Sequence, residues 1–349
     1  MRFGILAAVL FGMSAPLSKL LLEGVDPIIL AGLLYLGAGG ALGLLLLIRK
    51  ALGQADHEAA LEGQDLPWLL GAILTGGVAG PILLLLGLQR TPAATASLLL
   101  NFEVVATGLL AFMLFRESVG RRTWGAILAV ALGGVLLTLD PSGGWGISLG
   151  AILVLGACLA WGFDNNFTGR ISLKDPKRIV AIKGIAAGTC SLILGLALSR
   201  PLPSLGRALW ALGLGIVSYG ASIALFVQSL RQVGAARTGA LFGMAPFVGV
   251  ALSLVLFRQL PEWRFFLALP LMVLAAILLA REEHEHPHIH TGVRHTHSHR
   301  HDDDHHDHAH GGGDGHPSHV HEHAHQDLSH SHAHLPDPHH RHGHKDASH

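Results

Sequence analysis

Histidine is the residue type with the most unusual distribution in this chain, because all of its 26 histidines except His57 lie in residues 284–349. Many alternate with another residue. In an extended chain, residues two apart lie on the same side, so each His-x-His could close on one cation. Neutral imidazole suits Zn, Ni, Co and Cu. The predicted metal ligands are His284, His286, His288, His290, His295, His297, His299, His301, His319, His321, His323, His325, His330, His332 and His334.

The same tail carries few large apolar side chains, so it is expected to be disordered on its own. Interleaved carboxylates such as Asp302 and Glu322 would add oxygen ligands. Binding needs neutral imidazole and should weaken below about pH 6.5. Such a tail could serve as a metal buffer, sensor or donor, or it could be a solvated segment that binds metal only in vitro.

Glu103 is an acidic residue in the middle of an apolar run, with Asn101 two residues before it. A carboxyl at bilayer depth needs an explanation. In a partly dry cavity it could bind and release a proton near neutral pH or bind a substrate amine, and the alternative is permanent pairing with an intramembrane lysine. Lys19 could bind a substrate carboxylate, neutralise Glu103, or extend to the lipid headgroups.

Asp164, Asn165 and Asn166 form the densest polar cluster within the apolar runs. Three consecutive polar residues cannot share one side of a helix, and Trp161 lies one turn before them. An aromatic ring beside a carboxylate and amides could line a site for a polar or cationic solute. The alternative is a polar clamp between helices. Lys183 is expected to extend towards the membrane surface.

Residues 1–283 must place these side chains in a membrane. Half of the chain is hydrophobic (50%), 14% is charged, and the mean hydropathy is +0.46. Apolar runs of about 20 residues are long enough to cross a bilayer. The ten predicted spans are 3–22, 28–48, 67–88, 93–115, 123–139, 147–169, 178–199, 208–230, 235–257 and 263–281.

Positive charge predicts the orientation. With a cytoplasmic N-terminus, the inside segments carry 13 Lys or Arg residues and the outside segments carry 5. The positive-inside rule favours this arrangement. Ten spans return the chain to the same side, so both termini, including the histidine-rich tail, are expected in the cytoplasm of a multi-pass inner-membrane protein.

The body also repeats itself. Ala93-Ala94 recurs as Ala235-Ala236, and Leu114-Phe115-Arg116 recurs as Leu256-Phe257-Arg258, both at an offset of 142 residues. Two units with five spans each must lie in opposite orientations. Inverted repeats of this kind are typical of alternating-access carriers, whose substrate site lies at the repeat interface. The predicted divisions are 1–140, 141–283 and a tail at 284–349.

Two local patterns then resemble a known family. Phe115-Arg116-Glu117 is followed by Arg122-Thr123-Trp124-Gly125-Ala126, and Ala160-Trp161-Gly162 opens the sixth span. Residues 3–281 resemble the EamA type of the drug/metabolite transporter superfamily. That family's Glu-Pro pair is split here, since Glu103 precedes Val104 and Pro246 follows Ala245. The resemblance implies ATP-independent export or exchange of small organic solutes.

The sequence therefore predicts an all-α integral membrane carrier of ten helices in two inverted repeats. No glycine-rich phosphate loop with its Lys-Ser/Thr is present, and no enzyme is predicted. No cofactor is required, although the tail could bind Zn, Ni or Co. The expected partners are a small-molecule or ion substrate, the lipid bilayer and transition-metal ions, with no nucleic acid. The sequence is also compatible with a homodimer. The alternatives are a divalent Ni, Co or Zn transporter, and a non-transporting protein that displays a metal-storage tail.

Overall fold

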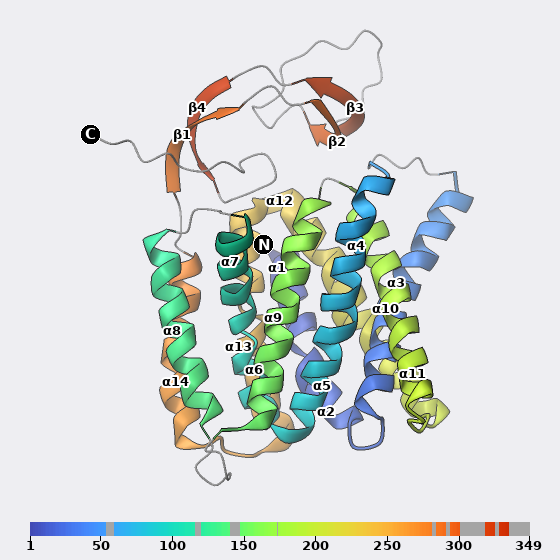
Figure 1. Cartoon of the computed structure of the whole chain (residues 1–349), viewed down its shortest axis with the longest axis vertical. Coiled ribbons are helices and arrows are strands. Elements are labelled where there is room, and N and C mark those ends of the chain that lie inside the picture. The colour runs from blue at the N-terminus through green and yellow to red at the C-terminus, as the bar shows by residue number, and fades with distance from the viewer. Residues whose placement is uncertain are drawn as a thin grey trace.

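The computed structural model describes residues 1–53, 59–115, 120–139, 147–172, 174–280, 284–290, 294–300, 318–324 and 328–334. Its body is a bundle of helices (Figure 1). Among the described residues, seven helical stretches are long and apolar enough to cross a membrane, judged by length and composition. They are Arg2–Leu21, Pro27–Ala51, Gly63–Arg90, Ala93–Leu114, Leu149–Arg170, Pro176–Ala197 and Leu205–Ser229.

Three shorter apolar helices occupy the remaining places where the sequence predicts spans, at Arg122–Thr138, Ala245–Phe257 and Trp263–Leu279. Large apolar side chains project outward from them and from the longer helices. Leu128, Ile193 and Val255 are 61%, 61% and 70% exposed. Apolar exposure on this scale fits contact with lipid. A helical membrane protein is thus confirmed, while the number ten stays a prediction.

The described residues between 1 and 139 form ten helical segments, of which η1 is a 3-10 helix and η2 a π-helix. They are α1 (Arg2–Gly12), α2 (Ser14–Leu21), α3 (Pro27–Ala51), η1 (Gly63–Asp65), α4 (Leu66–Ala72), η2 (Ile73–Ala79), α5 (Gly80–Arg90), α6 (Ala93–Leu99), α7 (Phe102–Phe115) and α8 (Arg121–Thr138).

Residues 147–280 form seven more segments, of which η3 is a second π-helix. They are α9 (Leu149–Arg170), α10 (Pro176–Ala197), α11 (Leu205–Leu214), η3 (Gly215–Ala221), α12 (Ser222–Phe242), α13 (Ala245–Phe257) and α14 (Trp263–Ala280).

Aspartate followed by proline begins two of the long helices. The Asp26 carboxylate accepts a hydrogen bond from the Ile28 amide at 2.9 Å, and Asp175 accepts one from the Lys177 amide at 2.9 Å. Each satisfies an amide that has no partner within the first helical turn. The following prolines suit the first helical position, where no amide hydrogen is needed. The Asp-Pro pairs therefore fix where α3 and α10 begin.

Three helix interruptions lie about one turn before a proline. The break between α1 and α2 precedes Pro16, η2 precedes Pro81, and the break between α12 and α13 precedes Pro246. Proline cannot donate to the carbonyl four residues earlier, and its ring crowds that carbonyl. Proline therefore accounts for these three interruptions. The π-helix η3 has no proline after it within the helix, so its irregularity has another cause.

The helices pack in pairs that bring residues far apart in the sequence together. α3 packs along α10, and α8 packs along α14. α9 lies against α5 and α7, whereas α1 lies against α12 and α13. The α3–α10 contact is close because it is made by glycines. A Cβ on Gly184 would lie 2.7 Å from the Gly39 Cα atom, so a larger residue would push these helices apart.

One predicted loop is wrong. The sequence predicts a break between residues 230 and 235, but α12 continues through this region to Phe242, and the break follows at Gly243–Met244. Ala235 and Ala236 have high helix propensity, and the first proline after them is Pro246. The interruption therefore moves to the point where the proline disrupts hydrogen bonding.

The structure also describes parts of the tail, whose expected disorder as a whole stays a prediction. The structure describes four strands: β1 (His284–His290), β2 (Arg294–Arg300), β3 (Ser318–Ala324) and β4 (Leu328–His334). β1 pairs with β4 and β2 pairs with β3, both antiparallel. They lie beyond the end of the bundle at which the N-terminus lies (Figure 1). Alternation of histidine with another residue has the period of a strand, which favours this conformation.

Candidate functional site

A buried ion pair lies between two consecutive long helices. The Lys183 Nζ of α10 lies 2.7 Å from Asp164 Oδ1 and 2.5 Å from Asp164 Oδ2 of α9. The side chains are only 18% and 7% exposed. Thr168 also donates to Asp164 Oδ1 at 3.0 Å. The prediction that Lys183 extends to the surface is therefore wrong, because the carboxylate of Asp164 offers it a partner inside the bundle.

The π-helix η2 packs directly against this ion pair. A Cβ on Gly76 would overlap the Asp164 carboxylate, so only glycine leaves room for it there. The Gly76 carbonyl accepts two side-chain hydrogen bonds, from Trp161 Nε1 at 3.0 Å and from the Tyr35 hydroxyl at 2.7 Å. Single π-turns inside α-helices are frequent at functional sites, because they change which backbone groups face the neighbours.

Aromatic rings extend this site towards the second π-helix. Tyr219 of η3 is buried. Its ring centroid lies 5.7 Å from that of Tyr35 and 5.8 Å from that of Phe11. Tyr35 therefore links the surroundings of η2 to those of η3. We call Tyr35, Gly76, Trp161, Asp164 and Lys183 the ion-pair site.

Glu103 belongs to a second polar cluster, on the other side of α9. Asn165 Nδ2 donates to Glu103 Oε1 at 3.0 Å and to Thr107 Oγ1 at 3.1 Å. Asn166 Nδ2 donates to the carbonyls of Thr107 at 3.1 Å and Gly162 at 2.8 Å. Glu103 is half-buried, and its partner Asn165 directly follows Asp164 in α9. We call Glu103, Thr107 and Asn165 the Glu103 cluster.

Asn165 faces the interior of the bundle and yet is exposed. It lies seven residues after Cys158, which is 0% exposed, so the two residues share one side of α9. The outer side of the helix is marked by Leu159, which is 46% exposed. The exposed surface of Asn165 therefore belongs to the inner side of α9, where a solute could reach the Glu103 cluster.

The remaining predicted site residues have local roles. Lys19 Nζ donates to the carbonyls of Leu88 and Thr91 at the end of α5. Pro92 has no amide hydrogen for the Leu88 carbonyl, so Lys19 supplies the missing donor. Asn101 is buried, and its amide bonds the Leu98 carbonyl at 2.8 Å in the turn between α6 and α7.

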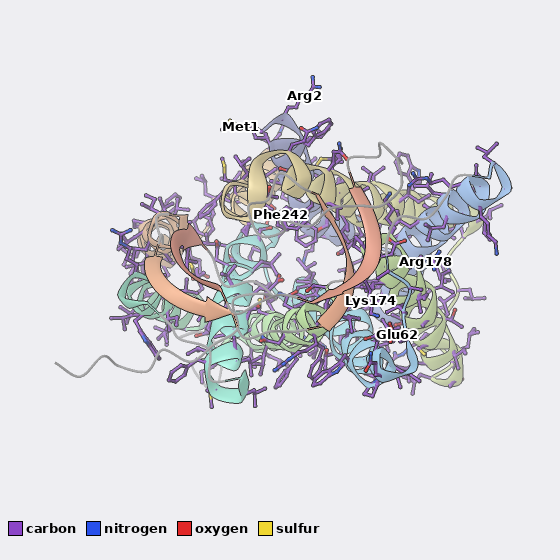
Figure 2. The ribbon with its side chains drawn as sticks, turned by 90° about the horizontal axis from the view of Figure 1, so that it is seen from above. Met1, Arg2, Glu62, Lys174, Arg178 and Phe242 are labelled. Atoms are coloured by element: carbon purple, nitrogen blue, oxygen red, sulfur yellow. The ribbon has the colours of Figure 1, made fainter. Side chains whose placement is uncertain are left out.

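A further charged group lies outside the spans and joins residues 59–65 to the start of α10. Lys174 lies 2.5 Å from Glu62 and 3.5 Å from Asp65, and the Asp175 amide donates to the Ala59 carbonyl at 3.1 Å. Figure 2 shows Glu62 and Lys174 on adjoining elements at this end of the molecule. We call these residues the Lys174 cluster.

The Lys174 cluster shifts the titration of its members. Hydrogen bonding and charge from Lys174 lower the pKa of Glu62. Burial disfavours the charge of Lys174, but its hydrogen bond to Glu62 and the charges of Asp65 and Glu62 outweigh burial and raise the pKa of Lys174. Both groups are therefore charged over a wide range around neutral pH.

Metal ligands do not gather in the part of the chain whose side chains the structure describes, where no group of three or more His, Cys, Asp or Glu residues could hold an ion. Of the predicted histidine ligands, His301 and His325 lie outside the described residues. The other thirteen lie in β1–β4.

Sequence reasoning missed Tyr35, Gly76 and Thr107, and it misjudged Lys183. Two features of residue spacing could have identified part of this site. Asp164 lies six residues before the end of α9 and Lys183 seven residues after the start of α10, so the two have similar depth in consecutive antiparallel helices. Thr107 lies one helical turn after Glu103 and thus on the same side of α7.

Comparison with known proteins shows which family this chain belongs to. The sequence profile of the EamA-like transporter family matches residues 1–139 and again residues 148–281. An uncharacterized transporter of Methanothermobacter thermautotrophicus is 29% identical over 275 residues, which cover 73% of this chain and 78% of that protein. The uncharacterized inner membrane transporter YedA of Escherichia coli (strain K12) is 27% identical over 293 residues, or 79% of this chain and 89% of YedA.

A solved crystal structure supports the same fold. It has a TM-score of 0.57 and 20% sequence identity, and the match covers 80% of this chain and 97% of that chain. At this identity the likeness concerns the fold alone. The two profile matches cover most of the chain, and they include both polar clusters of the bundle. The protein therefore belongs to the EamA-like transporter family and is a membrane protein of the transporter class.

Proposed function

We propose that this protein is a secondary transporter that exports or exchanges a small polar organic solute by alternating access. The ion-pair site carries the proposal. Asp164 and Lys183 form a buried ion pair beside the π-helix η2, within reach of the rings of Trp161 and Tyr35. A buried ion pair contributes little net stability, because desolvation offsets most of the attraction between the charges. A role in binding explains its presence better than a role in folding.

The ion-pair site and the Glu103 cluster would have different tasks. A charged group of the solute could replace one partner of the Asp164–Lys183 pair, while the rings of Trp161 and Tyr35 pack against its apolar part. Glu103 would take up and release a proton, with Asn165 as its hydrogen-bond donor. Because Glu103 bonds Asn165, the neighbour of Asp164 in α9, its protonation would change how tightly the pair holds a solute.

Alternating access would rest on ten membrane spans arranged as two inverted repeats. The two π-helices support this arrangement, because Ile73–Ala79 and Gly215–Ala221 lie 142 residues apart, the offset of the sequence repeat. The packing supports it as well. α9 contacts α5 and α7, and α1 makes the corresponding contacts with α12 and α13. Two separate matches to one family profile are a third line of support.

The proposed orientation places both termini in the cytoplasm of an inner-membrane protein. The excess of Lys and Arg in the segments on one side supports it. In this orientation the Lys174 cluster and the tail lie on the cytoplasmic side.

The second candidate function is transport of Ni, Co or Zn, with the tail gathering or sensing the ion. The tail favours it, but the predicted spans contain no histidine, and within the side chains that the structure describes there is no group suited to a metal. A third candidate is a non-transporting membrane protein with a metal-storage tail. Expression of the full chain and of a chain ending at residue 283, followed by measurement of cellular metal content, separates these candidates. Unchanged metal content in both excludes metal transport.

The main proposal is tested with purified protein in liposomes and a panel of amino acids, amines and organic acids. We expect at least one solute to raise the unfolding temperature and to show counterflow. Glu103→Gln should retain counterflow, which needs no net proton movement, but should lose uptake driven by a pH gradient. Glu262→Gln is the matched control, because that carboxylate is exposed and lies outside the ion-pair site. The proposal fails if no solute in the panel is moved by the wild type, or if Glu103→Gln transports like Glu262→Gln under both conditions.

A further inference from the structure

The two members of the Asp164–Lys183 pair differ in the partners that each of them has. The Asp164 carboxylate accepts hydrogen bonds from Lys183 Nζ, at 2.7 and 2.5 Å, and also from the Thr168 hydroxyl at 3.0 Å. In the part of the chain that the structure describes, Asp164 is the one residue that accepts from the Lys183 ammonium group. The carboxylate therefore has a second hydrogen-bond donor, whereas the ammonium group has no second acceptor there.

The second hydrogen bond of Asp164 lies within one helix. Thr168 follows Asp164 by one turn of α9, so the two side chains stay together when α9 moves. The bond to Lys183 instead crosses from α9 to α10. A solute that binds between these side chains would break the bond between the helices and leave the bond within α9 intact. Asp164 would then keep a donor, and Lys183 would lose its acceptor.

The surroundings of Lys183 make the loss of an acceptor costly. Its side chain is 18% exposed. A Cβ on Gly77 of η2 would lie 3.8 Å from Lys183 Cγ and 2.5 Å from the Cβ of Ala187, which is itself 0% exposed. The Lys183 stem is thus packed between α10 and η2. Because a buried charge without a partner is strongly unfavourable, this ammonium group needs another anion when Asp164 is no longer its partner.

This asymmetry distinguishes between classes of solute. An amine without an anionic group would take the place of Lys183 at Asp164, and it would leave the Lys183 ammonium group without an anion. A solute with a carboxylate would bind Lys183, while Asp164 kept its hydrogen bond from Thr168. If such a solute also carried an ammonium group, that group could pair with Asp164. Hydrogen bonds between charged groups are stronger than those between neutral groups, so the second arrangement is favoured.

We propose that the ion-pair site selects solutes that carry a carboxylate, which binds Lys183, and that Thr168 is a positioning residue that holds Asp164 while the solute is bound. This inference rests on the proposed transport of a small polar organic solute and narrows its class. Organic acids and zwitterions bind, whereas amines without an anionic group do not. Thr168 acts through Asp164 and need not touch the solute.

The first test compares compounds that share an apolar body and differ in charge. The sets are alanine with propionate and ethylamine, leucine with isocaproate and isoamylamine, and phenylalanine with hydrocinnamate and phenethylamine. Thermal unfolding of the full-length protein in detergent is measured at neutral pH with each compound at equal concentration. In at least one set, we expect the acid or the amino acid to raise the unfolding temperature and the amine to leave it unchanged. Which of the two stabilises the protein tells organic acids from zwitterions.

Two results of this comparison would overturn the inference. One is an amine that stabilises the protein as much as the acid and the amino acid of its set, and the other is that no acid or amino acid stabilises it. Counterflow of an amine in liposomes would then show that the protein is still a transporter of small solutes. The failure of this inference can thus be told from the failure of the proposed function.

The second test concerns Thr168 and uses counterflow of the carboxylate-bearing compound that stabilises the protein. Thr168→Val should raise the half-saturating concentration about tenfold, because Asp164 then lacks a donor while the solute occupies Lys183. The maximal rate should stay within about threefold of the wild type, since only binding is weakened. Thr168→Ser keeps the hydroxyl and should restore the half-saturating concentration to within about threefold.

Thr138→Val is the matched control, because it removes a threonine hydroxyl that bonds the Val135 carbonyl at 2.8 Å in α8, away from the ion-pair site. It should leave both kinetic quantities unchanged. The role of Thr168 is overturned if Thr168→Val behaves like Thr138→Val. It is also overturned if Thr168→Val lowers the maximal rate alone, or if Thr168→Ser does not recover.

Discussion

The two π-helices, η2 and η3, lie 142 residues apart in the sequence and have different neighbours. Around η2, Gly76 contacts the charged Asp164 and accepts hydrogen bonds from Trp161 and Tyr35. Around η3, Tyr219 contacts the rings of Phe11 and Tyr35. Both segments are π-helices, and among the side chains that the structure describes the buried ion pair lies beside η2.

The cause of the irregularity differs as well. η2 precedes Pro81, which removes one backbone hydrogen bond, but η3 precedes Ser222 and has no proline to explain it. A π-helix that persists without the residue that would force it points to a function for its geometry. We infer that the two irregular segments allow similar movements in both halves, while the side chains around η2 select the solute.

The largest expected effect comes from breaking the ion pair on one side. Asp164→Asn or Lys183→Met alone leaves a buried charge without its partner, which should lower the free energy of unfolding by roughly 3–5 kcal/mol. Denaturation followed by intrinsic tryptophan fluorescence in detergent measures this. Glu262→Gln serves as the control and should change little. A loss below about 1 kcal/mol would show that the pair is solvated, as surface pairs are.

The comparison between the π-helices predicts a difference between two glycine substitutions. Gly76→Ala should displace the Asp164 carboxylate, with a cost of about 1–3 kcal/mol in stability and a loss of solute binding. Gly220→Ala in η3 is the matched change, because its Cβ would meet the nearest atom, on Ala38, at an ordinary distance of 3.4 Å. Solute-dependent thermal stabilisation should therefore be lost in the first variant and kept in the second. Equal behaviour would contradict a special role for η2.

A smaller effect is expected at the Gly76 carbonyl, which has two side-chain donors. Trp161→Phe or Tyr35→Phe removes one hydrogen bond and should cost about 1 kcal/mol, since the other donor remains. The double variant should cost more than the sum of the single variants, because the carbonyl then loses both. A double-mutant cycle from denaturation curves measures this coupling. Strict additivity would mean that the two donors act independently.

The smallest expected effect is the contribution of the Lys174 cluster to the pH dependence of the free energy of unfolding. The folded pKa of Glu62 is below its ordinary value of 4.5, so its contribution to stability is present above that value and is lost as the pH falls through the folded pKa. The folded pKa of Lys174 is raised, so its contribution is complete below its ordinary value of 10.5 and is lost as the pH rises through the folded pKa.

Between about pH 6 and 9, Glu62→Gln should therefore not change how the free energy of unfolding depends on pH. At lower pH, the free energy of unfolding should fall less steeply in the variant than in the wild type. Thermal unfolding of wild type and variant from pH 4 to 9 measures the difference, with Glu262→Gln as the control. Identical acid limbs in the wild type and in Glu62→Gln would exclude this contribution.

Much of the fold could be predicted from the sequence, because the physical signals for it are local. Apolar length and the Asp-Pro caps place α3 and α10 within a few residues. The prolines predict breaks, although they do not say that the one before Pro81 is a π-helix. The sequence does not predict a continuous α12, because the short polar stretch after residue 230 is typical of a loop, whereas high helix propensity keeps it helical.

The candidate site was harder to predict because its contacts join distant residues. Glu103 and Asn165 were both recognised as unusual, but their hydrogen bond connects α7 with α9, and no local pattern specifies that packing. For Lys19 the sequence suggests a substrate, Glu103 or a headgroup as the partner, because it does not show that a proline leaves the Leu88 carbonyl without a donor. Gly76 gave no signal beyond the many other glycines of the spans.

The central claim is that the Asp164–Lys183 pair serves transport instead of folding, and the double variant Asp164→Asn with Lys183→Met tests it most directly. Removing both charges should restore the unfolding free energy to within about 1 kcal/mol of the wild type, since no unpaired charge remains. We predict that this stable double variant shows no counterflow of the solute in liposomes. Counterflow at the wild-type rate by the double variant would contradict the account.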